Sequence, residues 1–137
     1  MSFNVALTRQ SGEAVKSLDE TDPRGHITLV LRIADYLGLP ILANLDPYET
    51  HVFFGETARA LGSALKQIRD ALNPDLMDRA KRDQREHWLS YGPLNEGYEE
   101  WFRMATIERV RTIVEHLQAY SERAMGSEDM RLMFYGD

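Results

Sequence analysis

The chain of 137 residues carries a formal net charge of −6 at pH 7, and 43% of its residues are hydrophobic, so we expect a single domain over residues 1–137 with one core. Because cysteine is absent, disulfides, thiolate metal sites and a cysteine nucleophile are excluded, in agreement with a reducing cytoplasm. The acidic charge argues against a nucleic acid partner, whose binding relies on clustered Lys and Arg, and allows a basic protein partner.

The N-terminal segment Ser2 to Thr8 alternates apolar residues with polar or small ones, and this period of two predicts a strand with one buried face. The N-terminus has no basic segment followed by an apolar run, and the apolar stretches of the chain are far shorter than a bilayer span. We therefore expect no export signal and no membrane contact. Ser11 then predicts the N-cap of a short helix that runs to about Leu18.

A longer helix is predicted where Asp22 supplies a capping carboxylate and Pro23 occupies the first helical position. Apolar residues then recur at helical spacing up to Leu37. Gly38 and Pro40 follow directly, and both residue types interrupt helices. We expect the helix to end there.

The middle of the chain combines strand and helix signals. Ile41 to Asn44 is compatible with a short strand, Pro47 marks a turn, and Thr50 to Phe54 predicts a second strand because it is rich in residues that favour β structure. From Glu56 an apolar stripe predicts a helix that ends at Asn73-Pro74-Asp75.

The C-terminal half is predicted to be mainly helical. Asp75 to Leu89 is crowded with charges of both signs, which is typical of a solvated helix with one narrow contact row. Tyr91-Gly92-Pro93 breaks the chain, and a long helix is expected from about Asn95 to Met125, with Gly126 as its terminator. The ending MRLMFYGD predicts a closing strand.

These elements together predict an α+β fold. We expect a mostly helical domain with a small antiparallel or mixed sheet of three to four strands, covered by four to five helices. The sheet is built from the N-terminal, middle and C-terminal strands.

Aromatic residues gather in the stretch from Trp88 to Phe102, WLSYGPLNEGYEEWF, which contains both tryptophans. Such surface needs cover, from the chain's own core or from a partner. On a straight long helix, the stripe from Ile107 to Ala124 would face the core while Trp101 would lie nearly opposite. In one alternative the charged helix folds back and buries Trp88 against Trp101. In the other these aromatic residues form a partner surface.

The Trp101 side of the predicted long helix also carries basic residues at seven-residue spacing, each directly after a glutamate. Aromatic and arginine side chains are enriched at the energetic centres of protein interfaces. The sequence therefore predicts a partner-binding face, for another protein or for a second copy of the chain. Its candidate residues are Trp88, Tyr91, Tyr98, Trp101, Arg109, His116 and Arg123.

Catalytic and metal-binding patterns are absent from the sequence. The four histidines do not occur at metal-ligand spacing such as HxxxH or HExxH, and the glycines form neither a P-loop nor a dinucleotide-binding turn. No serine lies in a Gly-x-Ser-x-Gly setting. We expect no metal, no cofactor and no catalytic residue. The alternative is a small enzyme or ligand-binding protein with a cleft lined by Arg109, Glu115 and His116.

Two stretches of the chain, LPILANLDPY with the following His51-Val52-Phe53 and the ending LMFYGD, resemble a group of small bacterial proteins of unknown function. The shared features are a Leu-Pro-x-Leu…Asp-Pro-Tyr turn before a strand and helix, and a terminal strand that ends on Gly-Asp. The resemblance implies a fold but no activity. It fits a sheet in which the strand at Thr50 to Phe54 pairs with the terminal strand at Leu132 to Tyr135.

The functional hypothesis that follows is a non-enzymatic cytoplasmic protein-binding domain. Its most concrete form is a bacterial immunity or antitoxin-type protein, because the chain is small, acidic and free of catalytic patterns, and because its aromatic cluster can anchor a partner.

Overall fold

The computed structural model describes residues 3–136, so the expectations for Ser2 and Asp137 lie outside the described residues. Within that range four strands form one sheet in the order β2-β1-β4-β3, and every neighbouring pair is antiparallel. The strands are β1 (Phe3–Arg9), β2 (Ala14–Ser17), β3 (Thr50–Phe53) and β4 (Met130–Gly136). The expected pairing of the middle strand with the terminal strand is confirmed, with Thr50 opposite Tyr135.

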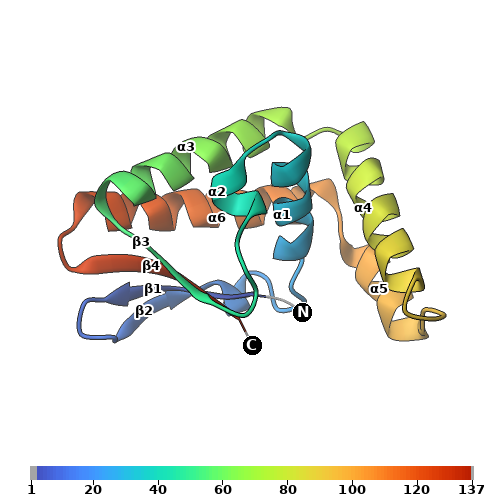
Figure 1. The fold of residues 1–137 in the computed structure, drawn as a ribbon, viewed down its shortest axis with the longest axis horizontal. Helices are drawn as coiled ribbons and strands as arrows, with labels where there is room; N and C mark the ends of the chain where they lie inside the picture. The colour runs from blue at the N-terminus through green and yellow to red at the C-terminus, as the bar shows by residue number, and fades with distance from the viewer. Residues whose placement is uncertain (1–2, 137) are drawn as a thin grey trace.

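The described residues also form six α-helices. They are α1 (Ile27–Tyr36), α2 (Pro40–Ala43), α3 (Gly55–Ala71), α4 (Pro74–Leu89), α5 (Glu96–Met104) and α6 (Ile107–Gly126), with a short 3-10 helix at Leu18–Glu20. In Figure 1, α3 and α6 lie along the sheet, whereas α4 and α5 stand at one end of the molecule. The mostly helical α+β fold predicted from the sequence is therefore confirmed.

The core lies between the sheet and the pair α3 and α6. Leu7 and Phe134 on the two central strands are fully buried, as are Leu65 of α3 and Val114 of α6. Helices α3 and α6 pack closely at Gly62 of α3. A Cβ added to this glycine would approach the Ser121 hydroxyl of α6 to 2.9 Å. The predicted apolar stripe of the last helix is thus its core-facing side.

Two short elements differ from the sequence-based expectation. The helix predicted from Ser11 to Leu18 is wrong, because β2 occupies Ala14–Ser17 and pairs with β1. Its Val15 packs on the core while its neighbours point outward, so a strand buries that side chain. The strand predicted at Ile41 to Asn44 is also wrong. That segment lies in and just after α2, where Pro40 presets the first helical position and Leu42 is fully buried.

The long helix predicted from Asn95 to Met125 is two helices. α5 ends at Met104, and α6 begins at Ile107 with the Thr106 hydroxyl accepting a hydrogen bond from the backbone N–H of Arg109. Ala105 between them is buried and non-helical. Because the chain changes direction there, aromatic residues of α5 and the apolar stripe of α6 can both face the interior.

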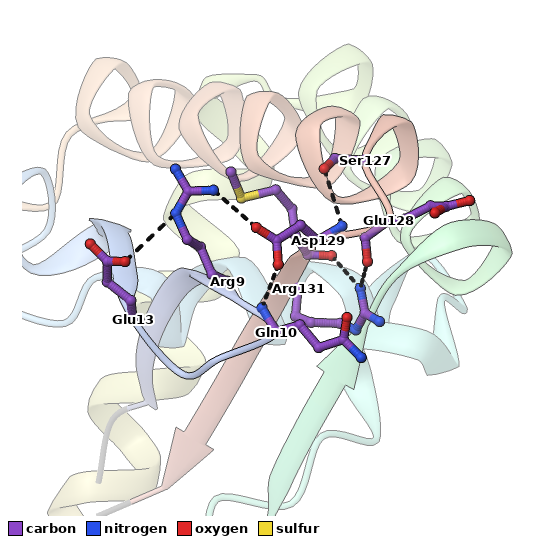
Figure 2. Close-up of polar contacts among 8 residues, drawn as sticks. Arg9, Gln10, Glu13, Ser127, Glu128, Asp129 and Arg131 are labelled. Atoms are coloured by element: carbon purple, nitrogen blue, oxygen red, sulfur yellow. Dashed lines mark hydrogen bonds and ion pairs between the residues drawn. The ribbon is translucent and has the colours of Figure 1, made fainter.

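One end of the sheet is held by a polar cluster that joins two turns of the chain (Figure 2). Arg9 at the end of β1 donates from Nη1 to Asp129 Oδ2 at 3.0 Å, and the backbone N–H of Gln10 donates to Asp129 Oδ1 at 3.2 Å. Arg131 donates to the carbonyl oxygen of Glu128 at 2.8 Å and lies over the ring of Phe54 at 4.1 Å. The ion pair of Arg9 with Asp129 and the hydrogen bond from Gln10 therefore hold the two turns together.

Replacing Asp129 with asparagine should make the protein less stable at neutral pH and flatten its acid unfolding. The hydrogen bond from Arg9 lowers the pKa of Asp129 below its ordinary value of 3.8, so the folded state binds fewer protons than the unfolded state. The contribution of Asp129 to stability is present above the unfolded-state pKa of 3.8 and is lost as the pH falls through the lower folded-state pKa. Urea titrations between pH 7 and about pH 3 check this. Identical pH dependence in both proteins would contradict it.

Candidate partner-binding groove

Helices α4 and α5 form a hairpin at one end of the molecule, to the right in Figure 1. The connection runs through Gly92, whose φ of +138° is a conformation that glycine adopts without strain. Asn95 then accepts a hydrogen bond from the backbone N–H of Tyr98 and starts α5. The break predicted at Tyr91-Gly92-Pro93 therefore reverses the chain and brings the two helices together.

Aromatic side chains fill the space inside this hairpin. The Trp88 ring lies 5.0 Å from Tyr98, 4.8 Å from Trp101 and 5.3 Å from Phe102, measured between ring centroids. Arg85 closes one side, because it pairs with Glu99 at 2.6 Å. This arrangement is the one in which the charged helix folds back and covers Trp88 with Trp101.

The hairpin is attached to the body of the protein through Trp101, which is 9% exposed. Its indole Nε1–H donates to the carbonyl oxygen of Arg24 at 2.7 Å, and its own carbonyl oxygen accepts from Nε2 of His26 at 2.9 Å. The centroids of the His26 and Trp101 rings lie 4.6 Å apart. Trp101 is therefore part of the core of its own chain.

His26 lies at the start of α1 in a fully buried position. The carboxylate of Asp22 caps this helix, since it accepts the backbone N–H of His26 at 2.7 Å and that of Ile27 at 2.8 Å. Nδ1 of His26 is 3.8 Å from Asp22 Oδ1 and has no hydrogen-bond partner among the described residues. Burial lowers the pKa of His26 below 6.5, more than the hydrogen bond to Trp101 and the charge of Asp22 raise it.

A surface groove of about 490 Å³ opens beside the hairpin, and we call it the aromatic groove. Tyr91 is 80% exposed, Tyr48 is 75% exposed and Tyr98 is 42% exposed. The rings of these three tyrosines therefore present apolar surface to solvent. Trp88, which is partly buried, lines the same groove. The groove is lined by Pro47, Tyr48, His87, Trp88, Tyr91, Gly92, Pro93, Leu94 and Tyr98.

Tyr48 reaches the groove from a different part of the chain, the loop before β3. Asp46 Oδ1 accepts the backbone N–H of Tyr48 at 2.8 Å, and the backbone N–H of Asp46 donates to Nε2 of His51 at 3.0 Å. The end of β4 supports the same loop, because a Cβ added to Gly136 would overlap the carbonyl oxygen of Pro47. The absence of a side chain at Gly136 lets the loop approach the strand.

Replacing Gly136 with alanine should displace the Pro47–Tyr48 loop and reshape the groove. The added methyl group meets backbone, which must move, and we expect a loss of about 1–3 kcal/mol in the free energy of unfolding. Chemical shifts of Tyr48 and His51 would report the movement. Gly126→Ala is the control, because a Cβ there meets no atom within 4 Å. Unchanged shifts in Gly136→Ala would contradict the prediction.

The structure separates the seven predicted partner residues. Trp101 is buried in the core of its own chain, and His116 is exposed on α6. Trp88, Tyr91 and Tyr98 come together in the aromatic groove. On α6, Arg109 is half-buried and near His26, whereas Arg123 is exposed.

The alternative cleft was expected to combine Arg109, Glu115 and His116. Glu115 and His116 are exposed, and Nδ1 of His116 is 2.9 Å from the carbonyl oxygen of Thr112 within the same helix. Five surface hollows found among residues 3–136 are lined by other residues. The geometry therefore favours the groove over this cleft as a binding site.

Six of the nine lining residues were not among the predicted partner residues, and two of these six, Tyr48 and His87, carry aromatic rings. Tyr48 follows a proline in a loop that is distant along the chain, and only the packing of that loop against β4 places it beside the hairpin. His87 is one turn before Tyr91, and their rings lie 5.4 Å apart. The helical spacing of this pair was a signal that could have identified His87.

Among residues 3–136, no group of three or more His, Cys, Asp or Glu side chains is placed to hold a metal ion. None of the helices in this range is both long and apolar enough to span a membrane. Comparison of the chain with protein-family models, curated proteins and solved structures finds no match. The resemblance to small bacterial proteins thus stays a prediction, and functional inference rests on the geometry of the site.

Proposed function

We propose that this protein is a non-enzymatic binding protein that contacts a protein partner through the aromatic groove. The observation that carries the proposal is the exposure of Tyr48, Tyr91 and Tyr98 around one groove. Tyrosine and tryptophan dominate the energetic centres of interfaces because they combine a large apolar surface with a polar tip. A contiguous apolar patch with this composition is typical of an interaction site.

The support under the groove also favours binding. Trp88 is fixed between α4 and α5, and Trp101 ties the hairpin to the loop at Arg24. On the other side, the turn at Asp46 holds Tyr48. A groove that is ordered before binding loses less conformational entropy when a partner arrives, so more of the contact energy appears as affinity.

The most concrete role that we infer is a bacterial immunity or antitoxin-type protein of the cytoplasm. A protein of this kind blocks a toxic partner by covering it. The net charge of −6 supports a basic partner, since opposite charges accelerate association and disfavour wrong partners. The exposed aromatic residues supply the anchors that charge alone does not.

A photo-crosslinking amino acid at Tyr91, introduced in the native host, tests the proposal. The same substitution at Val52 is the control, because Val52 is 43% exposed on β3 and does not line the groove. We expect one defined protein to be crosslinked from position 91 and not from position 52. A crosslink to the protein's own chain would indicate a homodimer through the groove. Absence of a position-specific adduct would contradict the proposal.

A further inference from the structure

We propose that the aromatic groove binds an extended basic segment of the partner, with a lysine or arginine side chain of that segment lying on its aromatic rings. This inference rests on the proposed function and names the chemistry that the groove recognises.

Charged residues next to the groove are predominantly acidic. Asp46 and Glu49 flank the lining residues Pro47 and Tyr48 along the chain, and Glu86 precedes His87. Glu96 follows shortly after Leu94 and lines a separate hollow. Glu49, Glu86 and Glu96 are exposed, and none of the three forms an ion pair within residues 3–136. Their negative charge is thus available to a ligand.

Positive charge is absent from the lining itself. The nine described residues that line the groove include neither Lys nor Arg. The nearest arginine on α4, Arg85, is paired with Glu99 at 2.6 Å. Arg82, one turn earlier, lies 3.5 Å from Asp83. A basic ligand would therefore meet unpaired carboxylates, while Arg82 and Arg85 are already paired. This charge complementarity favours a cationic ligand over an acidic or purely apolar one.

The rings of Tyr48, Tyr91 and Tyr98 provide the second part of the recognition. An ammonium or guanidinium group is attracted to the face of an aromatic ring, and the attraction increases when nearby groups exclude water. Trp88 at the base, between Tyr98 and Trp101, adds a fourth ring. The protein uses the same contact internally, where the Arg79 guanidinium lies 3.8 Å from the centroid of the Tyr36 ring.

The ligand is a segment of chain because the aromatic groove continues into a second cleft. That cleft has a volume of about 360 Å³ and shares Pro47, His87 and Trp88 with the groove. Asp35 and Arg32 both line this cleft, and Arg32 donates a hydrogen bond of 3.1 Å to the uncharged amide oxygen of Gln84. A peptide that crosses both hollows can place one basic side chain on the rings of the aromatic groove and another beside Asp35 in the second cleft.

The test uses three unstructured peptides that alternate serine with lysine, with arginine or with uncharged norleucine. Binding is measured by calorimetry, and its location by the NMR shifts of the Tyr91 and Tyr98 rings. We expect the lysine and arginine peptides to bind at least about tenfold more tightly than the norleucine peptide, and to weaken by about tenfold or more from about 50 mM to about 500 mM salt. Glu49→Gln/Glu86→Gln should weaken binding by a similar factor.

The matched control is Glu108→Gln/Glu115→Gln on α6, which removes the same charge from positions outside the groove and should leave affinity within about twofold. Equal binding of the norleucine peptide, no binding of the basic peptides, or equal effects of the two double variants would overturn the inference. Those results would not contradict the proposed function, which has its own test. The proposed function is contradicted if crosslinking from position 91 yields no position-specific adduct.

Discussion

Replacing Trp101 with alanine is expected to reduce the free energy of unfolding by about 3–5 kcal/mol, the range measured when a buried tryptophan is truncated. Its ring packs against Trp88, Phe102 and His26 at once, so its removal empties the centre of the α4–α5 hairpin. The carbonyl oxygen of Arg24 would also lose its indole donor. Urea unfolding followed by circular dichroism measures the change.

Trp101→Phe separates packing from hydrogen bonding. Phenylalanine keeps most of the ring but has no N–H for Arg24, so we expect a smaller loss of about 1–3 kcal/mol. An interface role through a homodimer predicts something else, namely an altered molecular mass with unchanged stability. Trp101→Ala with a loss below about 1 kcal/mol would show that Trp101 is not part of the core and would contradict the account.

His26→Leu is expected to cost about 1–3 kcal/mol at pH 7.5, because the buried carbonyl oxygen of Trp101 would lose its donor. Leucine has a similar volume, so the loss reports the hydrogen bond more than the packing. His26→Gln can place an amide N–H near the position of Nε2 and should recover part of the stability. Equal losses in the two variants would show that the hydrogen bond contributes nothing.

Stability should also decrease in mild acid because of His26. Burial lowers its pKa below 6.5, whereas the unfolded chain keeps the ordinary value, so the unfolded state binds more protons as the pH falls. The free energy of unfolding therefore decreases from pH 6.5 down toward the folded-state pKa. Asp22 opposes this effect and Arg24 and Arg109 reinforce it. The measurement is the free energy of unfolding of the wild type and of His26→Gln between about pH 7.5 and pH 5. An equal decrease in both proteins would show that groups other than His26 cause the loss of stability.

The sequence predicted the elements that depend on local or periodic signals. Asp22 was expected to cap a helix with Pro23 at its first position, but this start is wrong, because α1 begins at Ile27. The Asp22 carboxylate still accepts the backbone N–H groups of His26 and Ile27, so its predicted use as an acceptor at the start of the helix is confirmed. The pairing of Thr50–Phe53 with the terminal strand is confirmed as well. Both signals, a carboxylate near a helix start and an alternation of period two, can be recognised from neighbouring residues in the sequence. Tertiary contacts did not change the local structure that either signal predicts.

Elements whose conformation depends on tertiary contacts were predicted wrongly. Residues 14–17 form an edge strand because β1 offers a pairing partner, and no local signal excluded a helix there. The end of α5 at Met104 is a similar case. Ala105 has a high helix propensity, yet it is non-helical because the change of direction lets Trp101 and Val110 both reach the core. Thr106, a good N-cap residue, was the local signal for that break.

The candidate site was predicted only in part. The density of aromatic residues from Trp88 to Phe102 located the hairpin correctly, but it did not separate the buried Trp101 from the exposed Tyr91. That separation depends on which ring reaches the loop at Arg24, a contact across 77 positions of the chain. Tyr48 was missed for the same reason, because its position in the groove results from the packing of its loop against Gly136.

The most direct test of the central claim, that the aromatic groove is the binding surface, is the affinity of the crosslinked partner for the purified protein and for Tyr91→Ser/Tyr98→Ser. Tyr91 is 80% exposed, whereas Tyr98 is 42% exposed and packs on Trp88, so we expect the double variant to lose about 1–2 kcal/mol in the free energy of unfolding and to remain folded. We predict that its Kd for the partner rises by about 100-fold, as expected for the loss of interface anchors. An unchanged Kd in the folded double variant would contradict the account.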